Sequence, residues 1–186
     1  MKTLTRMMLP CILMVGLACM VFAQGQPKKP EKKPQTGTKM ATDQTLPYQA
    51  TYSSKFEIGD PAMSKKILDI WKDWDDGVVD RHAAWFADTL AMYHADGSMA
   101  KGKDSVMAGA KSYRGSMVSA KSTIQAWIPL RSTDMNENWV AIWGMEEDTW
   151  KDGKKTTKAL HEIWRFNKDG KIDLMRQFEA KVPPGQ

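Results

Sequence analysis

Two residues of this chain, His94 and Glu162, have side chains that could together move a proton. Histidine accepts or delivers a proton near neutrality, because its unperturbed pKa is close to neutral pH. Glu162 lies in an alternating stretch beside Trp164 and Phe166, so we expect it on a face that forms part of the core. Burial disfavours a charged carboxylate, and a neutral glutamic acid can donate a hydrogen bond to a developing oxyanion. We therefore assign His94 as candidate base and Glu162 as candidate acid or hydrogen-bond donor.

A hairpin turn fixes the faces of the strand that carries Glu162. Asn167-Lys168-Asp169-Gly170 separates two alternating stretches, and its Asp-Gly end supplies the positive φ that a tight reversal needs. Alternation then predicts two faces, Leu160, Glu162, Trp164 and Phe166 on one and His161, Ile163 and Arg165 on the other.

Five more residues are candidates for binding a ligand. Trp71 and Trp143 are candidate pocket walls, Tyr93 or Tyr113 could supply a hydroxyl group, and Arg176 is a further candidate contact. Each assignment has a plainer alternative.

A histidine at a strand end is commonly a turn residue, and tryptophans commonly fill a core. Glu162 could equally form a structural ion pair with Arg176 on the neighbouring strand.

Hydrophobic periodicity predicts the elements that position these residues. Asp60-Pro61 opens a helix that Gly77 ends. Two further helices and five strands follow, at Val79–Phe86, Thr89–His94, Gly102–Met117, Ser122–Arg131, Trp139–Trp150, Thr156–Phe166 and Ile172–Ala180. This order predicts an α+β domain in which three N-terminal helices pack on one face of a curved, mainly antiparallel sheet.

The chain before this domain has the composition of an export signal and a spacer. Lys2 and Arg6 precede an apolar run, which indicates a signal peptide at residues 1–23 that is too short to span a membrane comfortably. A lipoprotein anchored through Cys19 is the less favoured alternative, because Gly16 stands where a lipobox has a branched aliphatic residue. Residues 24–46 are rich in Lys and Pro and predict a disordered spacer before the domain at 47–186. We therefore expect an exported protein, periplasmic or extracellular.

Charge and cysteine content narrow the function classes. The net charge of +5 belongs to the leader and spacer, since 20 basic and 20 acidic residues remain from Pro47 onward. A nucleic-acid-binding domain concentrates positive charge on its folded part, so we do not expect that function. Both cysteines, Cys11 and Cys19, lie in the leader, and the three histidines lack metal-ligand spacing. The sequence predicts no metal and no cofactor.

Several motifs resemble the NTF2-like superfamily, and within it the SnoaL-like group. They are Phe86-Ala87-Asp88 before the strand ending Asp96-Gly97, then Gly102-Lys103-Asp104-Ser105-Val106, and most strongly Glu162-Ile163-Trp164-Arg165-Phe166 followed by Asp169-Gly170-Lys171-Ile172. The resemblance implies a cone-shaped fold around one cavity, frequent pairing of two copies through the sheet, and no particular reaction.

Ketosteroid isomerase offers the sharpest comparison within that superfamily. Its general base corresponds by position to His94 and its oxyanion-hole Asp to Glu162, whereas its oxyanion-hole Tyr falls at Ile70-Trp71 and is missing here. The isomerase activity is therefore not carried across.

Three functional hypotheses follow. The first is a protein that binds a small, largely apolar molecule in its cavity, as a homodimer formed through the sheet. The second is an enzyme of the same shape doing isomerase- or hydratase-type proton transfer with His94 and Glu162. The third is a non-catalytic assembly module whose cavity is filled by tryptophan.

Overall fold

The computed structural model describes residues 46–182. The predicted signal peptide, both cysteines and all of the predicted spacer except Leu46 lie outside the described residues. None of the described helices is long and apolar enough to cross a membrane. The elements in chain order are β1 (Phe56–Ile58), α1 (Pro61–Asp76), the 3₁₀ turn η1 (Ala83–Trp85), β2 (Phe86–Tyr93), β3 (Met99–Lys101), α2 (Lys103–Gly115), β4 (Met117–Ser132), β5 (Glu137–Trp150), β6 (Lys155–Phe166) and β7 (Ile172–Lys181).

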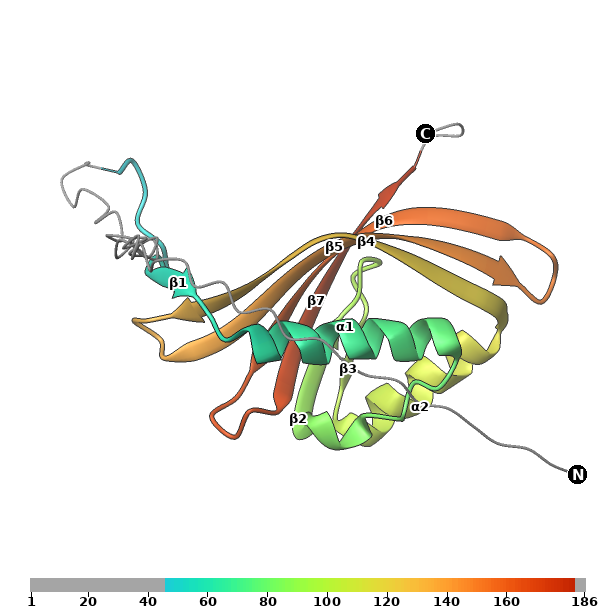
Figure 1. Cartoon of the computed structure of the whole chain (residues 1–186), viewed down its shortest axis with the longest axis horizontal. Coiled ribbons are helices and arrows are strands. Elements are labelled where there is room, and N and C mark those ends of the chain that lie inside the picture. Colours follow the sequence, from blue (N-terminus) through green and yellow to red (C-terminus); the bar gives the residue numbers. More distant parts are fainter. Residues whose placement is uncertain (1–45, 183–186) are drawn as a thin grey trace, which may run out of the picture. The chain divides into compact units, whose positions relative to one another are not determined.

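The strands form one curved, mixed sheet in the order β1-β4-β5-β6-β7-β2-β3. Every neighbouring pair is antiparallel except β2 and β7, which are parallel. Both α-helices lie against the same face of the sheet (Figure 1), which we call the inner face. The predicted α+β architecture, with helices on one face of a mainly antiparallel sheet, is confirmed.

Helix α1 begins and ends where the sequence predicts. The Asp60 carboxylate accepts a hydrogen bond from the backbone N–H of Ala62, and Pro61 occupies the first turn, where its missing N–H costs nothing. Gly77 closes the helix in the left-handed conformation with φ of 72°, which other residues adopt only with strain. The stripe that includes Ile67 and Trp71 is buried against the sheet.

The predicted second helix at Val79–Phe86 is wrong. This segment makes hydrogen bonds three residues apart, from Arg81 N to Val78 O and from Trp85 N to His82 O, which is 3₁₀ rather than α geometry. Phe86 is buried and pairs with Ile172 as the first residue of β2. An eight-residue segment cannot offset helix nucleation once its last residue joins the sheet. The described residues therefore hold two α-helices, not the predicted three.

The five predicted strands are present, and several are longer than predicted. β2 begins at Phe86, and β4 begins directly after α2 at Met117. Two further strands, β1 and β3, did not stand out in the sequence, because each has only three residues, too few for a period of two to be recognised.

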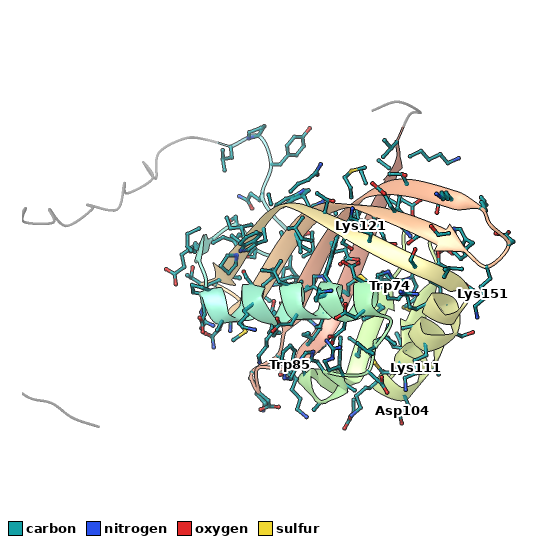
Figure 2. The ribbon with its side chains drawn as sticks, turned by 45° about the vertical axis from the view of Figure 1, so that its right-hand side comes forward. Trp74, Trp85, Asp104, Lys111, Lys121 and Lys151 are labelled. Atoms are coloured by element: carbon teal, nitrogen blue, oxygen red, sulfur yellow. The ribbon has the colours of Figure 1, made fainter. Side chains whose placement is uncertain are left out.

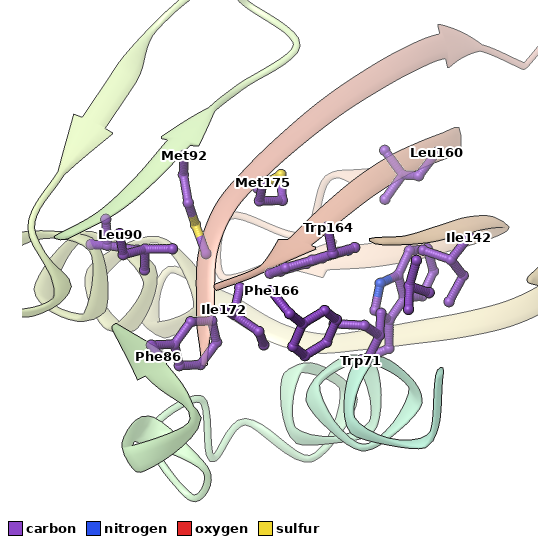
Figure 3. Packing of buried hydrophobic residues seen from close by; sticks show 13 residues of the cluster. Trp71, Phe86, Leu90, Met92, Ile142, Leu160, Trp164, Phe166, Ile172 and Met175 are labelled. Carbon is purple, nitrogen blue, oxygen red and sulfur yellow. The ribbon is translucent and has the colours of Figure 1, made fainter. Parts of the chain in front are cut away.

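The core lies between α1 and the inner face of the sheet. Trp71 projects from α1 toward the strands, where Trp164, Phe166 and Ile142 meet it (Figure 3). Gly144 on β5 leaves room for this packing: a Cβ atom there would lie 2.8 Å from Cζ3 of Trp71 and 3.0 Å from the carbonyl oxygen of Thr123.

Replacing Gly144 by alanine should therefore destabilise the domain by about 1–3 kcal/mol, because the new methyl group overpacks the contact with Trp71. Gly109→Ala on α2 is the matched control: its Cβ would have no heavy atom within 4 Å, and we expect a gain of about 0.5–1 kcal/mol. Urea denaturation of both variants measures the difference. Equal stability of the two would contradict the assigned packing.

Candidate functional site

Strand parity places Glu162 inside the protein, as the sequence predicts. Residues Leu160, Glu162 and Trp164 of β6 are buried on the inner face, whereas His161, Ile163 and Arg165 point to the outer face and are half-buried. The backbone register puts Glu162 opposite Ile142 on β5 and opposite Gln177 on β7. Its carboxylate is therefore held between central strands.

A cavity of about 470 Å³ lies against the inner face. Its apolar wall comes from α1, α2 and the strands, and includes Trp71, Trp74, Phe86, Tyr113, Trp164 and Met175. Its polar lining includes His94, Glu146, Lys158, Glu162 and Gln177. Figure 2 shows Trp74 near the C-terminal end of α1. The tryptophans line the cavity and leave it open.

Glu162 accepts hydrogen bonds from three side-chain N–H groups. Nε1 of Trp71 lies 2.7 Å and Nε1 of Trp164 lies 3.0 Å from the same carboxylate oxygen, Oε2. Nε2 of Gln177 lies 2.9 Å from the other oxygen, Oε1. Burial raises the pKa of Glu162, and the three donors, which favour the charged form, oppose that effect only in part.

His94 lies at the end of β2 and lines the same cavity as Glu162. Its backbone N–H donates to the carbonyl of Ser98, which closes the turn through Asp96 and Gly97. The exposed residues Asp96 and Ser98 also line the cavity, so His94 lies at its solvent-facing side.

Two of the five candidate ligand contacts line the cavity and three do not. Trp71 and Tyr113 line it. Trp143 lies on the outer face, where its ring stacks on His161 with 4.6 Å between centroids. Tyr93 and Arg176 pair across β2 and β7, with the guanidinium 4.5 Å from the tyrosine ring centroid, and neither lines the cavity. The interpretation of Trp143, Tyr93 and Arg176 as cavity contacts is therefore wrong, because strand parity turns them outward.

The same parity excludes the proposed ion pair between Glu162 and Arg176. Arg176 is paired with Ile163 on the outer face, one residue out of phase with Glu162. The neighbour of Glu162 on β7 is Gln177, which donates to it without carrying a charge.

The sequence did not indicate a second polar cluster, which lies at the cavity. Lys158 Nζ on β6 lies 2.7 Å from Oε1 of Glu146 and 3.1 Å from Oδ2 of Asp148, both on β5. Burial raises the pKa of Glu146 to about 7 against the opposing charge of Lys158. Burial alone would lower the pKa of Lys158, but the two carboxylates outweigh it and raise this pKa. The hairpin at Lys151-Asp152-Gly153-Lys154 sets Glu146 opposite Lys158. The register of this hairpin is the feature of the sequence from which the ion pair could have been predicted.

Asp73, near the end of α1, is buried and lies outside the cavity lining. One of its oxygens accepts from Arg81 at 2.9 Å, and the other lies 2.6 Å from Nδ1 of His82, whose ring stacks on Trp85. This cluster fixes the turn after α1 to the helix. Among residues 46–182, no group of three or more His, Cys, Asp or Glu side chains is placed to hold a metal ion.

No protein-family model matches the sequence, and a search of curated proteins finds no match either. Solved structures do match. An NTF2-like protein of unknown function from Exiguobacterium sp. 255-15 aligns over 64% of this chain and 99% of its own, with TM-score 0.52 and 18% identity. The protein has the NTF2-like fold.

Two further solved structures are similar to this chain. An LEH-like epoxide hydrolase from M. tuberculosis aligns over 64% of this chain and 84% of its own, with TM-score 0.54 and 12% identity. AusH from Aspergillus nidulans aligns over 68% of this chain and 89% of its own, with TM-score 0.54 and 10% identity. At these identities the likeness establishes the NTF2-like fold alone, as the resemblance in the sequence implied.

The geometry of Glu162 predicts how substitutions at this position change stability. Glu162→Leu removes the acceptor of three buried N–H groups, and we expect a loss of about 3 kcal/mol or more. Glu162→Gln keeps an acceptor for both tryptophans, and a flip of the Gln177 amide restores the third bond, so we expect a loss near 1 kcal/mol. Thermal and urea unfolding of the two variants measure the difference. Equal losses would contradict the hydrogen-bonding scheme.

Proposed function

We propose that this NTF2-like protein binds a small, largely apolar molecule in its cavity. The observation that carries this proposal is the cavity itself. Its volume of about 470 Å³ lies within the range of small-molecule sites, about 300–1,000 Å³. Its wall is mainly aromatic and aliphatic, with a few polar groups that could orient a ligand.

Trp74 supports a ligand that also carries a hydrogen-bond acceptor. Trp74 lines the cavity, and its Nε1 is buried without an acceptor among residues 46–182. A buried donor without a partner is costly, so a hydroxyl or carbonyl oxygen on the bound molecule would stabilise the complex.

We also propose that the protein is exported and acts in the periplasm or outside the cell. This rests on the sequence of residues 1–23, where Lys2 and Arg6 precede an apolar run that ends in small residues. A small-molecule binding domain behind a polar spacer fits that location.

Proton-transfer catalysis is a second candidate function. It is favoured by His94 and Glu162 lining one cavity and by the raised pKa of the buried carboxyl group. A neutral Glu162 could donate to an oxyanion while His94 removes a proton. The assembly-module hypothesis has less support, because its tryptophan-filled interior does not match the open cavity.

Filling the cavity should abolish binding. Ala110 on α2 lines the cavity, whereas Ala108 is exposed on the same helix and does not. We expect Ala110→Trp to lose binding of phenethyl alcohol, a small neutral aromatic probe, and Ala108→Trp to keep it. Saturation-transfer NMR on the probe measures binding, and thermal unfolding verifies that both variants fold. Undiminished binding to a folded Ala110→Trp variant would place the ligand elsewhere.

We propose that two copies pair through the outer face, as the resemblance implied. His161 lies between Trp143 and Phe178 there, with ring centroids 4.6 Å and 5.7 Å apart, and Phe178 is 52% exposed. A second copy would cover this aromatic surface, whereas α1 and α2 cover only the inner face.

Light scattering on residues 47–186 should then give twice the monomer mass at micromolar concentration. Phe178→Asp should yield a monomer, because it places a charge in the pairing surface. Ile58→Asp, an equally polar change at an exposed residue of the edge strand β1, is the control and should remain dimeric. A monomeric wild type would refute this proposal.

A further inference from the structure

One end of the cavity holds an ion cluster that the acid–base hypothesis does not use. Glu146 and Lys158 both line the cavity, and their charged atoms lie 2.7 Å apart. Asp148 lies behind them, 1% exposed, with Oδ2 at 3.1 Å from the same ammonium group. Two carboxylates therefore share one ammonium group.

The charge on the cavity wall is unbalanced. Within residues 46–182, the carboxylates of Asp96, Glu146 and Glu179 line the cavity beside the carboxyl group of Glu162, whose pKa is raised by burial, and Lys158 is the single lysine or arginine that does so. Lys158 is already paired with two carboxylates, so it cannot offset the others. A wall of this kind attracts a cation and repels an anion.

The same corner has aromatic faces suited to an ammonium group. The Tyr113 ring lies 6.0 Å from Lys158 Nζ and stacks against Trp74, with 6.0 Å between the ring centroids. Aromatic faces attract cations, most strongly where water is excluded. The position of Lys158 thus shows that an ammonium group fits beside Glu146 and Tyr113.

We propose that the ligand of the cavity is an aromatic or aliphatic amine in its protonated form, and that Glu146 binds its ammonium group. This rests on the proposed function, since it names the chemical class of the molecule bound in that same cavity. The apolar part of the ligand would contact the aromatic wall, and its ammonium group would balance the second carboxylate of the cluster.

Binding of such a ligand depends on pH through Glu146. Burial raises the pKa of Glu146 to about 7, so its carboxylate is mostly ionised at pH 8 and mostly protonated at pH 6. Protonation removes the charge that binds the ammonium group, so affinity falls as the pH falls through 7. The charged and titratable groups around this position are Asp148 on β5, Lys158 on β6, Glu179 on β7 and Tyr113 on α2. Asp75 on α1 is a further one, since it accepts from Ser122, which pairs with Glu146 across β4 and β5.

Three probes with one skeleton and different charge test the proposal: phenethylamine, phenethyl alcohol and phenylacetate. Dissociation constants are measured by NMR titration of the full domain at pH 8 and pH 6. We expect phenethylamine to bind about tenfold more tightly than the alcohol at pH 8, and about tenfold less tightly at pH 6 than at pH 8. The amine stays protonated at both values, because alkylamines titrate near pH 10. The alcohol should show no such change.

Two variants assign the effect to Glu146. Glu146→Gln should remove both the preference for the amine and its pH dependence, although His94 is still present in the cavity. Glu147→Gln, an exposed neighbour on the same strand, should behave as wild type. If alcohol and amine bind equally, or phenylacetate binds best, the amine proposal is overturned while cavity binding stands. If none of the three probes binds, both proposals fail.

Discussion

Trp71 fixes α1 to the sheet at two points, and the cavity depends on both. Its ring packs against Gly144 on β5, where even one methyl group would be too large. Its indole N–H donates to Glu162 on β6. Because Trp71 also lines the cavity, a single side chain sets the position of the helix, the geometry of a buried carboxylate and part of the ligand-facing wall. A change in core packing at this residue is therefore also a change in the site.

The two buried carboxylates of the cavity are stabilised in different ways. Glu162 is held by the N–H dipoles of neutral side chains, whereas Glu146 is held by the full charge of Lys158. Neutral donors offset only part of the free-energy cost of burying a charge. Lys158 also offsets only part of that cost for Glu146, because it is shared with Asp148. Both carboxyl groups consequently have raised pKa values, and that of Glu146, about 7, lies where a small change of pH changes its charge.

The sequence predicts the fold well because its strongest signals are local. The cap at Asp60 and the left-handed Gly77 fix the ends of α1, and the turn before Gly170 fixes the register of β6 with β7. The inward direction of the Glu162 side chain follows from that register. The outward direction of Trp143 and the pairing of Glu146 with Lys158 depend instead on how β5 pairs with β6. The turn of the β5–β6 hairpin is visible in the sequence. Which residues of β5 and β6 face each other, and on which face of the sheet, follows only from the register. The misassigned helix at 79–86 depends on a tertiary contact, the burial of Phe86, which no local pattern contains.

The hydrogen bonds of Glu162 limit the chemistry that this NTF2-like site can perform. An ionised carboxylate oxygen has two lone pairs in the plane, and on Oε2 both are used by the N–H groups of Trp71 and Trp164. Oε1 accepts only from Gln177 and keeps one position free. A proton carried by Glu162, and any bond to a ligand, therefore belongs to Oε1. The indole N–H of Trp71 is already committed to this carboxylate and is not free to donate to a ligand. A ligand oxygen would then accept from a protonated Glu162 or from the indole N–H of Trp74, which has no acceptor among residues 46–182.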